Sequence, residues 1–203
     1  MISHPVVSQS NLLAKRFELL KSAPVIVVVG KNADFDKTIA NDIVIWLESK
    51  GISASLKYDD EIDLSALNGS HIIVVGGPLS NSLAASACSL LSSWFEIVND
   101  SIILFAAGFK FKGKGMGVVN MEKVLNVDCG GILVLIAGID RNGTLAAAKA
   151  FMFSLSMWGE VAVVKAWRDS YKLISCYEAL SPAEKEKQRK KEEGAGVVLV
   201  RVG

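Results

Sequence analysis

Polar side chains that could bind a ligand follow three apolar segments, each of which ends in glycine. Lysine and asparagine follow the first segment, serine and asparagine the second, and aspartate, arginine and threonine the third. The predicted ligand-binding residues are Gly30, Lys31, Asn32, Gly77, Ser80, Asn81, Asp140, Arg141 and Thr144. Amide groups and a guanidinium suit an anionic small molecule, so this set would take a phosphorylated or nucleotide-like ligand.

The third loop, residues 138–144, has the most specific pattern. Gly138 permits a sharp turn, and Arg141 would lie near a helix N-terminus, where the helix dipole and the guanidinium together favour an anion. In the structural alternative, Asp140 and Arg141 tie the loop together and Thr144 only caps the helix. Both interpretations fit the residues.

The other two loops match no nucleotide-binding motif. The second, residues 76–81, lacks the lysine of a phosphate-binding P-loop and the third glycine of a dinucleotide fingerprint. Asn81 suits a helix cap and a ligand contact equally well. The first loop, residues 30–34, carries a weaker pattern. The loops therefore indicate where a site would lie without naming its ligand.

Catalytic and metal-binding patterns are missing from the sequence. His4 lies in the N-terminal tail and His71 begins a predicted strand, where a structural role is the commoner one for histidine, and no Gly-x-Ser-x-Gly elbow occurs. The acidic segment 59–61 is typical of a solvated loop. The three cysteines are too far apart for a zinc motif. We therefore expect no catalytic residue, no metal and no cofactor.

Each apolar segment is predicted to be a strand that leads into an alanine-rich helix. Repeated strand–turn–helix units place their loops at one edge of a parallel sheet. The predicted strands are 25–29, 71–75, 102–106 and 132–137, the helices 34–50, 79–98 and 144–158, and the antiparallel hairpin 161–167 with 172–176. The expected fold is α/β: a three-layer, Rossmann- or flavodoxin-like domain with a mainly parallel sheet and an antiparallel C-terminal hairpin at its edge.

The chain divides into three predicted parts. Residues 1–23 contain an N-terminal helix, residues 24–178 form the α/β domain, and residues 179–203 form a charged helix or linker followed by a final strand. Ser181 and Glu184 have the spacing of a helix capping box. The charged run that follows has no apolar face, so we expect it to be solvated.

The composition favours association with other proteins over binding to nucleic acid or a membrane. The net charge of +1 creates no field that attracts nucleic acid or anionic lipid. Hydrophobic residues make up 51% of the 203 residues, yet no apolar run is long enough to cross a membrane. We therefore expect a homo-oligomer that associates through surface strands, 161–167 or 197–202. The first residues lack a signal-peptide pattern, so we expect a cytoplasmic protein.

Three segments in order resemble the domain of archaeal S-layer (cell-surface lattice) proteins. The matching stretches are residues 28–36, residues 74–81 and residues 137–144, the last an Ala-Gly-x-Asp-Arg-x-Gly-Thr pattern. This last stretch is also weakly similar to bacterial cell-wall-binding repeats. The resemblance implies a non-catalytic structural or interaction domain and a place at the cell surface.

Two hypotheses follow: a self-associating structural domain, and a binding protein or enzyme whose loops at the carboxyl edge of the sheet take a phosphorylated or nucleotide-like small molecule. A ligand site requires an open pocket with Arg141 pointing into it, covered by a flap at residues 110–114. A structural domain instead lets Asp140 pair with Arg141 or with neighbouring backbone and leaves the crevice filled. The geometry of these loops therefore distinguishes the two.

Overall fold

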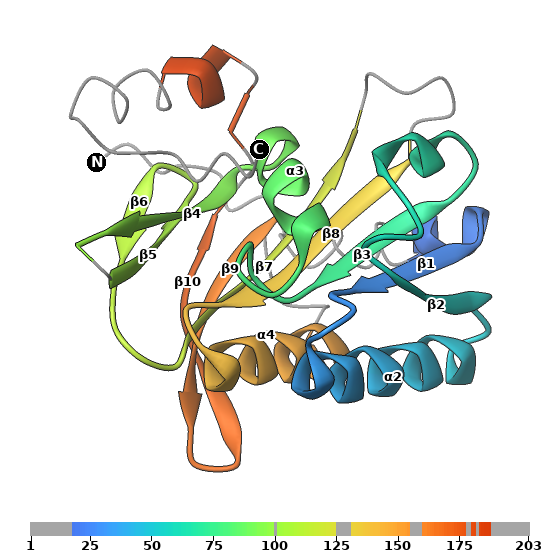
Figure 1. Ribbon diagram of the computed structural model, residues 1–203, viewed down its shortest axis with the longest axis horizontal. Helices are drawn as coiled ribbons and strands as arrows, with labels where there is room; N and C mark the ends of the chain where they lie inside the picture. The colour runs from blue at the N-terminus through green and yellow to red at the C-terminus, as the bar shows by residue number, and fades with distance from the viewer. Residues whose placement is uncertain are drawn as a thin grey trace, which may run out of the picture.

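The computed structural model describes residues 18–99, 101–124, 131–154, 160–177, 180–181 and 183–187 (Figure 1). Its strands form a seven-stranded mixed sheet and a separate three-stranded antiparallel sheet. The strands are β1 Val25–Val29, β2 Ala54–Tyr58, β3 His71–Val75, β4 Ser93–Val98, β5 Ser101–Ala106, β6 Phe109–Phe111, β7 Met116–Lys123, β8 Ile132–Gly138, β9 Val161–Trp167 and β10 Ser170–Tyr177. The helices are η1 Leu20–Ser22, α2 Asp34–Ser49, η2 Leu64–Asn68, α3 Ser82–Leu90 and α4 Arg141–Ser154.

The large sheet has the order β10-β9-β7-β8-β3-β1-β2. Strands β2, β1, β3 and β8 run parallel. Strand β7 pairs antiparallel with both β8 and β9, so β9 runs in the same direction as β8, and β10 pairs antiparallel with β9. The central strands β3 and β8 are buried along almost their whole length, as continuous runs of Ile, Val and Leu predict for parallel strands covered on both faces. The loops that follow β1, β3 and β8 therefore lie at the same edge of the sheet, at the carboxyl ends of these strands.

The two faces of the large sheet are covered by different kinds of structure. Helices α2 and α4 pack on one face, around side chains such as Val27, Ile43 and Phe151. Helix α3 and the three-stranded sheet cover the other face, around side chains such as Val28, Leu91 and Phe105. Figure 1 shows α2 and α4 together on one side of the sheet and β4, β5 and β6 apart from it.

The predicted three-layer, Rossmann- or flavodoxin-like fold with a mainly parallel sheet is wrong. The helix expected over residues 79–98 ends at Leu90, and residues 93–98 form β4, which pairs antiparallel with β5. The strand expected at 102–106 thus belongs to the small sheet instead of the large one. Aromatic and β-branched residues dominate β4, and they favour a strand over a helix. The fold is strand-rich, with strands where an outer helical layer was expected.

The antiparallel hairpin of β9 and β10 lies at one edge of the large sheet. Strand β9 is not itself an edge, because β7 pairs with its other side. The strand 161–167, on which we expected association, is therefore paired on both sides, and the open edge of the sheet belongs to β10. Figure 1 shows this hairpin projecting past α4.

The segment 110–114, expected as a flap, also differs from the prediction. Strand β6, which contains residues 110 and 111, pairs with β5. The Lys110 Nζ lies over the Phe105 ring of β5, 5.4 Å from the ring centroid. Residues 109–111 are therefore part of the small sheet and not a separate flap.

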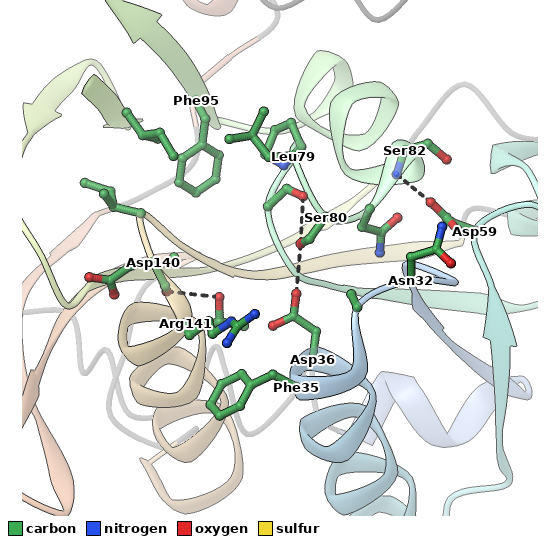
Figure 2. Close-up of a pocket in the computed structure, with 18 of the residues that line it drawn as sticks. Asn32, Phe35, Asp36, Asp59, Leu79, Ser80, Ser82, Phe95, Asp140 and Arg141 are labelled. Atoms are coloured by element: carbon green, nitrogen blue, oxygen red, sulfur yellow. Dashed lines mark hydrogen bonds between the residues drawn. The ribbon is translucent and has the colours of Figure 1, made fainter. Parts of the chain in front are cut away.

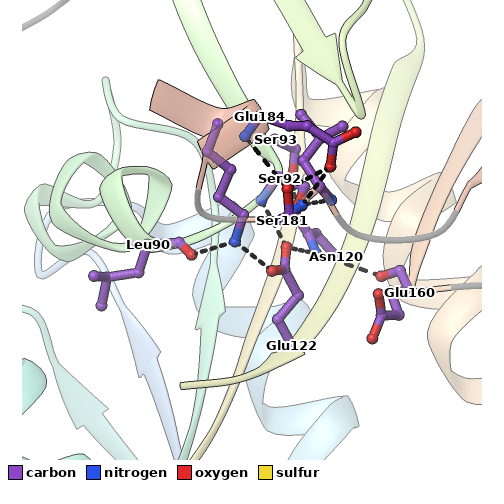
Figure 3. Close-up of polar contacts among 10 residues, drawn as sticks. Leu90, Ser92, Ser93, Asn120, Glu122, Glu160, Ser181 and Glu184 are labelled. Atoms are coloured by element: carbon purple, nitrogen blue, oxygen red, sulfur yellow. Dashed lines mark hydrogen bonds and ion pairs between the residues drawn. The ribbon is translucent and has the colours of Figure 1, made fainter. Parts of the chain in front are cut away.

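The segment near the C-terminus contacts the body of the molecule (Figure 3). Ser181 and Glu184 form the predicted capping box: the Ser181 amide and hydroxyl donate to the Glu184 carboxylate at 2.9 and 2.6 Å. Lys185 then donates to the buried Glu122 carboxylate at 2.5 Å and to the Leu90 carbonyl at 2.8 Å. Lys185 is therefore not solvated, contrary to what the charged run predicted.

Three predictions concern residues that lie wholly or largely outside the described ones. They are the N-terminal helix within residues 1–23, of which residues 18–23 are described, the strand at 197–202, and most of the charged run before that strand. In the part of the chain that is described, no helix combines the length and apolar character needed to span a bilayer.

Candidate functional site

The loops after β1, β3 and β8 meet at the carboxyl edge of the large sheet and line a pocket of about 970 Å³ (Figure 2). Parallel neighbouring strands share this edge, which explains why segments far apart in the sequence converge. Eight of the nine predicted residues line the pocket: Lys31, Asn32, Gly77, Ser80, Asn81, Asp140, Arg141 and Thr144.

The ninth residue, Gly30, lies where the first two loops touch. A Cβ atom built on Gly30 would lie 1.6 Å from the Ser80 carbonyl oxygen, far inside van der Waals contact. Only glycine lets the first loop approach the second this closely. Gly30 therefore serves loop packing at the base of the pocket.

The third loop is held together by Asp140. Its carboxylate accepts hydrogen bonds from the Gly115 and Gly143 amides, both at 2.9 Å, and its carbonyl accepts the Thr144 amide at 3.0 Å. The Thr144 hydroxyl also donates to the Asp140 carbonyl, at 3.4 Å. Asp140 and Thr144 thus use these polar groups inside the protein, as the structural alternative required.

The Asn81 side chain joins three elements at the second loop. Its amide group donates to the Val28 carbonyl at 3.1 Å and to the Val75 carbonyl at 2.9 Å, and its oxygen accepts the Leu83 amide at 3.0 Å. This buried side chain caps α3 and fastens the ends of β1 and β3. All its hydrogen-bonding atoms are occupied, so the helix cap is its observed role.

Asp59 is a pocket residue that the sequence did not single out. Its carboxylate accepts the Lys31 amide at 3.0 Å and the Ser82 amide at 2.7 Å, and so links the first and second loops. Burial alone would raise the pKa of Asp59, but the hydrogen bonds from Ser82 and Lys31 outweigh it and lower that pKa. The acidic segment was expected to be solvated. The position of Asp59 directly after β2 was the signal that could have placed it at this edge of the sheet.

Asp36 is the second residue that sequence reasoning missed (Figure 2). It is buried in the first turn of α2 and accepts the Ser80 hydroxyl at 2.8 Å. Burial raises the pKa of Asp36, and the Ser80 hydrogen bond and the Arg141 charge only partly offset that rise. The Arg141 guanidinium is exposed and lies 5.9 Å from the centroid of the Phe35 ring.

The charges around the pocket oppose a strongly anionic ligand. Four carboxylates line it, against the two cationic side chains of Lys31 and Arg141. The Lys31 ammonium is already paired with Asp60 at 2.6 Å. The four acids are Asp34, Asp36, Asp59 and Asp140, and the apolar part of the wall is Phe35, Pro78, Leu79, Phe95, Ile97, Ile102 and Ile139. The pocket is therefore both acidic and apolar.

The pocket meets one requirement of each hypothesis. It is open and bordered by Arg141, as a ligand site needs. Asp140, however, bonds to neighbouring backbone, as a structural domain needs. The segment 110–114, expected to cover a ligand, is not among the residues that line the pocket.

Catalytic and metal-binding groups do not assemble in the described structure. The contact of Ser80 with Asp36 comes nearest to a nucleophile with a base. His71 lies at the far end of β3, where its Nδ1 accepts the Ile132 amide at 3.1 Å. Among the described residues, no group of three His, Cys, Asp or Glu side chains could hold a metal ion.

A second polar cluster is buried between α3, β7 and the C-terminal segment (Figure 3). One oxygen of the Glu122 carboxylate accepts the Ser92 amide at 2.6 Å and the Asn120 side-chain amide at 2.8 Å, and the other accepts Lys185. The Ser92 hydroxyl in turn accepts the Leu180 amide at 2.7 Å. These bonds satisfy buried groups and fasten the segment, so the cluster is structural.

Comparison with protein families identifies one match. The model of the S-layer like family, outer domain, matches residues 48–155, slightly more than half of the 203 residues. The match includes the second and third pocket loops and begins after the first. None of the curated proteins compared with the chain is significantly similar to it.

Proposed function

The chain belongs to the S-layer like family, outer domain, and we propose that this structural domain is non-catalytic and associates with further copies of itself. The family membership supports a structural role. Self-association is the further step, and it rests on the surface of the molecule.

The observation that carries self-association is the exposed apolar hairpin of β9 and β10. Trp167 is 57% exposed, and Leu173 and Ile174 are 38% and 40% exposed. The hairpin projects past α4 and ends the large sheet, so β10 has no partner strand on its outer side within the described structure. Protruding apolar side chains beside an open sheet edge are typical of a protein–protein contact.

The lack of catalysis is supported by how the pocket uses its polar groups. Asn81 and Asp140 hold loops and a helix cap, and Asp59 fastens two loops together. Ser80 lies beside the Asp36 carboxylate without a histidine or metal cluster in the described part of the site. Such an arrangement stabilises the sheet edge and supplies no positioned nucleophile with its base and orienting group.

Self-association is tested by sedimentation of the purified chain across a hundredfold range of concentration. We expect the mean mass to rise with concentration, and Trp167→Glu to weaken association because it places a charge in the contact. Ile45→Glu is the matched control, since Ile45 is 65% exposed on α2 and lies away from the hairpin. A chain that stays monomeric throughout would contradict the proposal.

Binding of a phosphorylated or nucleotide-like molecule is the second candidate, favoured by the open pocket of about 970 Å³. A thermal-shift screen with nucleotides and sugar phosphates tests it. A ligand at 100 times its Kd should stabilise the fold by about 2.7 kcal/mol. A shift that Arg141→Ala abolishes would establish this candidate. The four carboxylates around the pocket lead us to expect no shift.

A further inference from the structure

We propose that the pocket at the carboxyl edge receives the β9–β10 hairpin of a second copy of the chain. This inference rests on the proposed self-association and names the surface that accepts the hairpin. It pairs two surfaces of complementary character: a protruding basic, apolar hairpin and an acidic, apolar pocket.

The end of the hairpin is basic and carries an aromatic side chain. Lys165, Arg168 and Lys172 surround a single acid, Asp169, in the two strands and their turn. The Lys172 Nζ lies 6.0 Å from the centroid of the Trp167 ring. The Asp169 backbone carbonyl accepts the Lys149 ammonium of α4, which holds the turn against the helix. The end of the hairpin is therefore positively charged, carries an aromatic ring and is held in place by α4.

The pocket offers the complementary surface. Its four carboxylates exceed its two cations, and the Lys31 cation is already paired with Asp60. Its apolar wall includes Leu79, which is 67% exposed, and Phe95 and Ile139. An aromatic ring could bury apolar surface against this wall while neighbouring basic groups approach the carboxylates.

The size of the pocket is also compatible with a chain segment as the occupant. Small-molecule pockets usually measure about 300–1,000 Å³. A pocket of about 970 Å³ lies at the upper end of that range and accommodates a large side chain with its neighbours. Because the hairpin and pocket are different surfaces, their contact is heterologous, and each copy both donates a hairpin and accepts one.

The test uses two variants of the full chain that each disable one surface. Trp167→Glu alters the hairpin, and Leu79→Lys adds a cation to the pocket rim. Both side chains are exposed, so folding should survive. Ile45→Lys controls for Leu79→Lys, because it makes the same kind of change on an equally exposed aliphatic residue of α2.

We expect each variant to weaken self-association about 30-fold or more, the effect of an interface hot spot. An equimolar mixture of the two variants should form a one-to-one complex, because one retains a pocket and the other a hairpin. Association should also weaken as salt rises, because the paired charges are screened. Ile45→Lys should associate like the unmodified chain.

Each alternative result overturns the proposal in a recognisable way. If the unmodified chain associates and Leu79→Lys does so equally well, the pocket is not the acceptor, while self-association stands; pairing of two β10 edges would give this result. If Leu79→Lys weakens association but the mixture forms no complex, the hairpin is not the donor. A chain that is monomeric at every concentration contradicts both this inference and the proposed function.

Discussion

Gly30 shows how little space separates the first two loops of the pocket. The neighbouring polar residues Lys31 and Asn32 line the cavity, whereas Gly30 lies against the Ser80 carbonyl. A glycine after an apolar strand looks the same in the sequence whether it contacts a ligand or packs against another loop. Only the packing of the two loops distinguishes these roles, and here Gly30 packs against the backbone carbonyl of Ser80.

Replacing Gly30 with alanine should destabilise the fold. The new methyl group would lie 1.6 Å from the Ser80 carbonyl oxygen, so the backbone of one loop must move. Overpacking of this kind costs about 1–3 kcal/mol or more, and denaturant unfolding measures it. Gly69→Ala is the control, because nothing lies within 4 Å of a Cβ there. Equal stability of the two variants would contradict the close approach.

The candidate site could be predicted in position but not in its chemistry. The loops converge because β1, β3 and β8 are parallel neighbours, and that follows from three repeated strand–turn–helix patterns. The roles of Asp36 and Asp59 could not be read in the same way. An acid at a helix start or in a loop is normally solvated, whereas these two carboxylates accept hydrogen bonds from Ser80 and Ser82, which are distant in the sequence.

At the level of elements, strands were more predictable than the boundary between α3 and β4. The runs that form β1, β3 and β8 are continuously apolar, which leaves few alternatives. Residues 83–95 also carry apolar side chains at helical spacing, so the periodicity continues past Leu90 where the helix ends. Pairing of β4 with β5, a tertiary contact, decides the structure of 93–98.

One largely buried ion pair helps to hold the short helical segment near the C-terminus. The Lys185 side chain is 14% exposed and the Glu122 side chain 8% exposed, so water screens their charges little. The same Glu122 carboxylate accepts hydrogen bonds from Ser92 and Asn120. The segment is thereby linked to β7 and to the residues that follow α3.

Lys185→Met should destabilise the protein by up to about 3 kcal/mol. Methionine fills the space of the lysine stem but leaves the Glu122 carboxylate buried without its cation. Denaturant unfolding gives the change, and Glu122→Gln combined with Lys185→Met should recover part of it, because the uncompensated charge is then removed. Lys187→Met, at an exposed position in the same segment, should change little.

In the whole molecule, stability should depend on pH through His71, which joins the segment before β1 to the large sheet. Its Nδ1 accepts the Ile132 amide at 3.1 Å, and its Nε2 lies 3.0 Å from the Leu19 carbonyl and 3.2 Å from the Ser22 hydroxyl. Burial lowers the pKa of His71, and the contact with Leu19 offsets only part of this effect. A proton on Nδ1 would also remove the acceptor for Ile132.

The sign of this dependence follows from the lowered pKa. As pH falls below about 6.5, the unfolded chain binds a proton at His71 before the folded chain does. The free energy of unfolding therefore decreases, by at most about 1.4 kcal/mol per pH unit from this group, until the lower folded-state pKa is passed. Above pH 7 the contribution is constant.

Thermal or denaturant unfolding between pH 5 and pH 8, compared with His71→Asn, isolates the effect. The asparagine oxygen can still accept the Ile132 amide but does not titrate in this range. The difference in unfolding free energy between the unmodified chain and His71→Asn should thus shrink or reverse as pH falls. Other titrating groups are present in both proteins, so their effects cancel in this difference. A difference that stays constant from pH 8 to pH 5 would show that burial does not lower the pKa of His71.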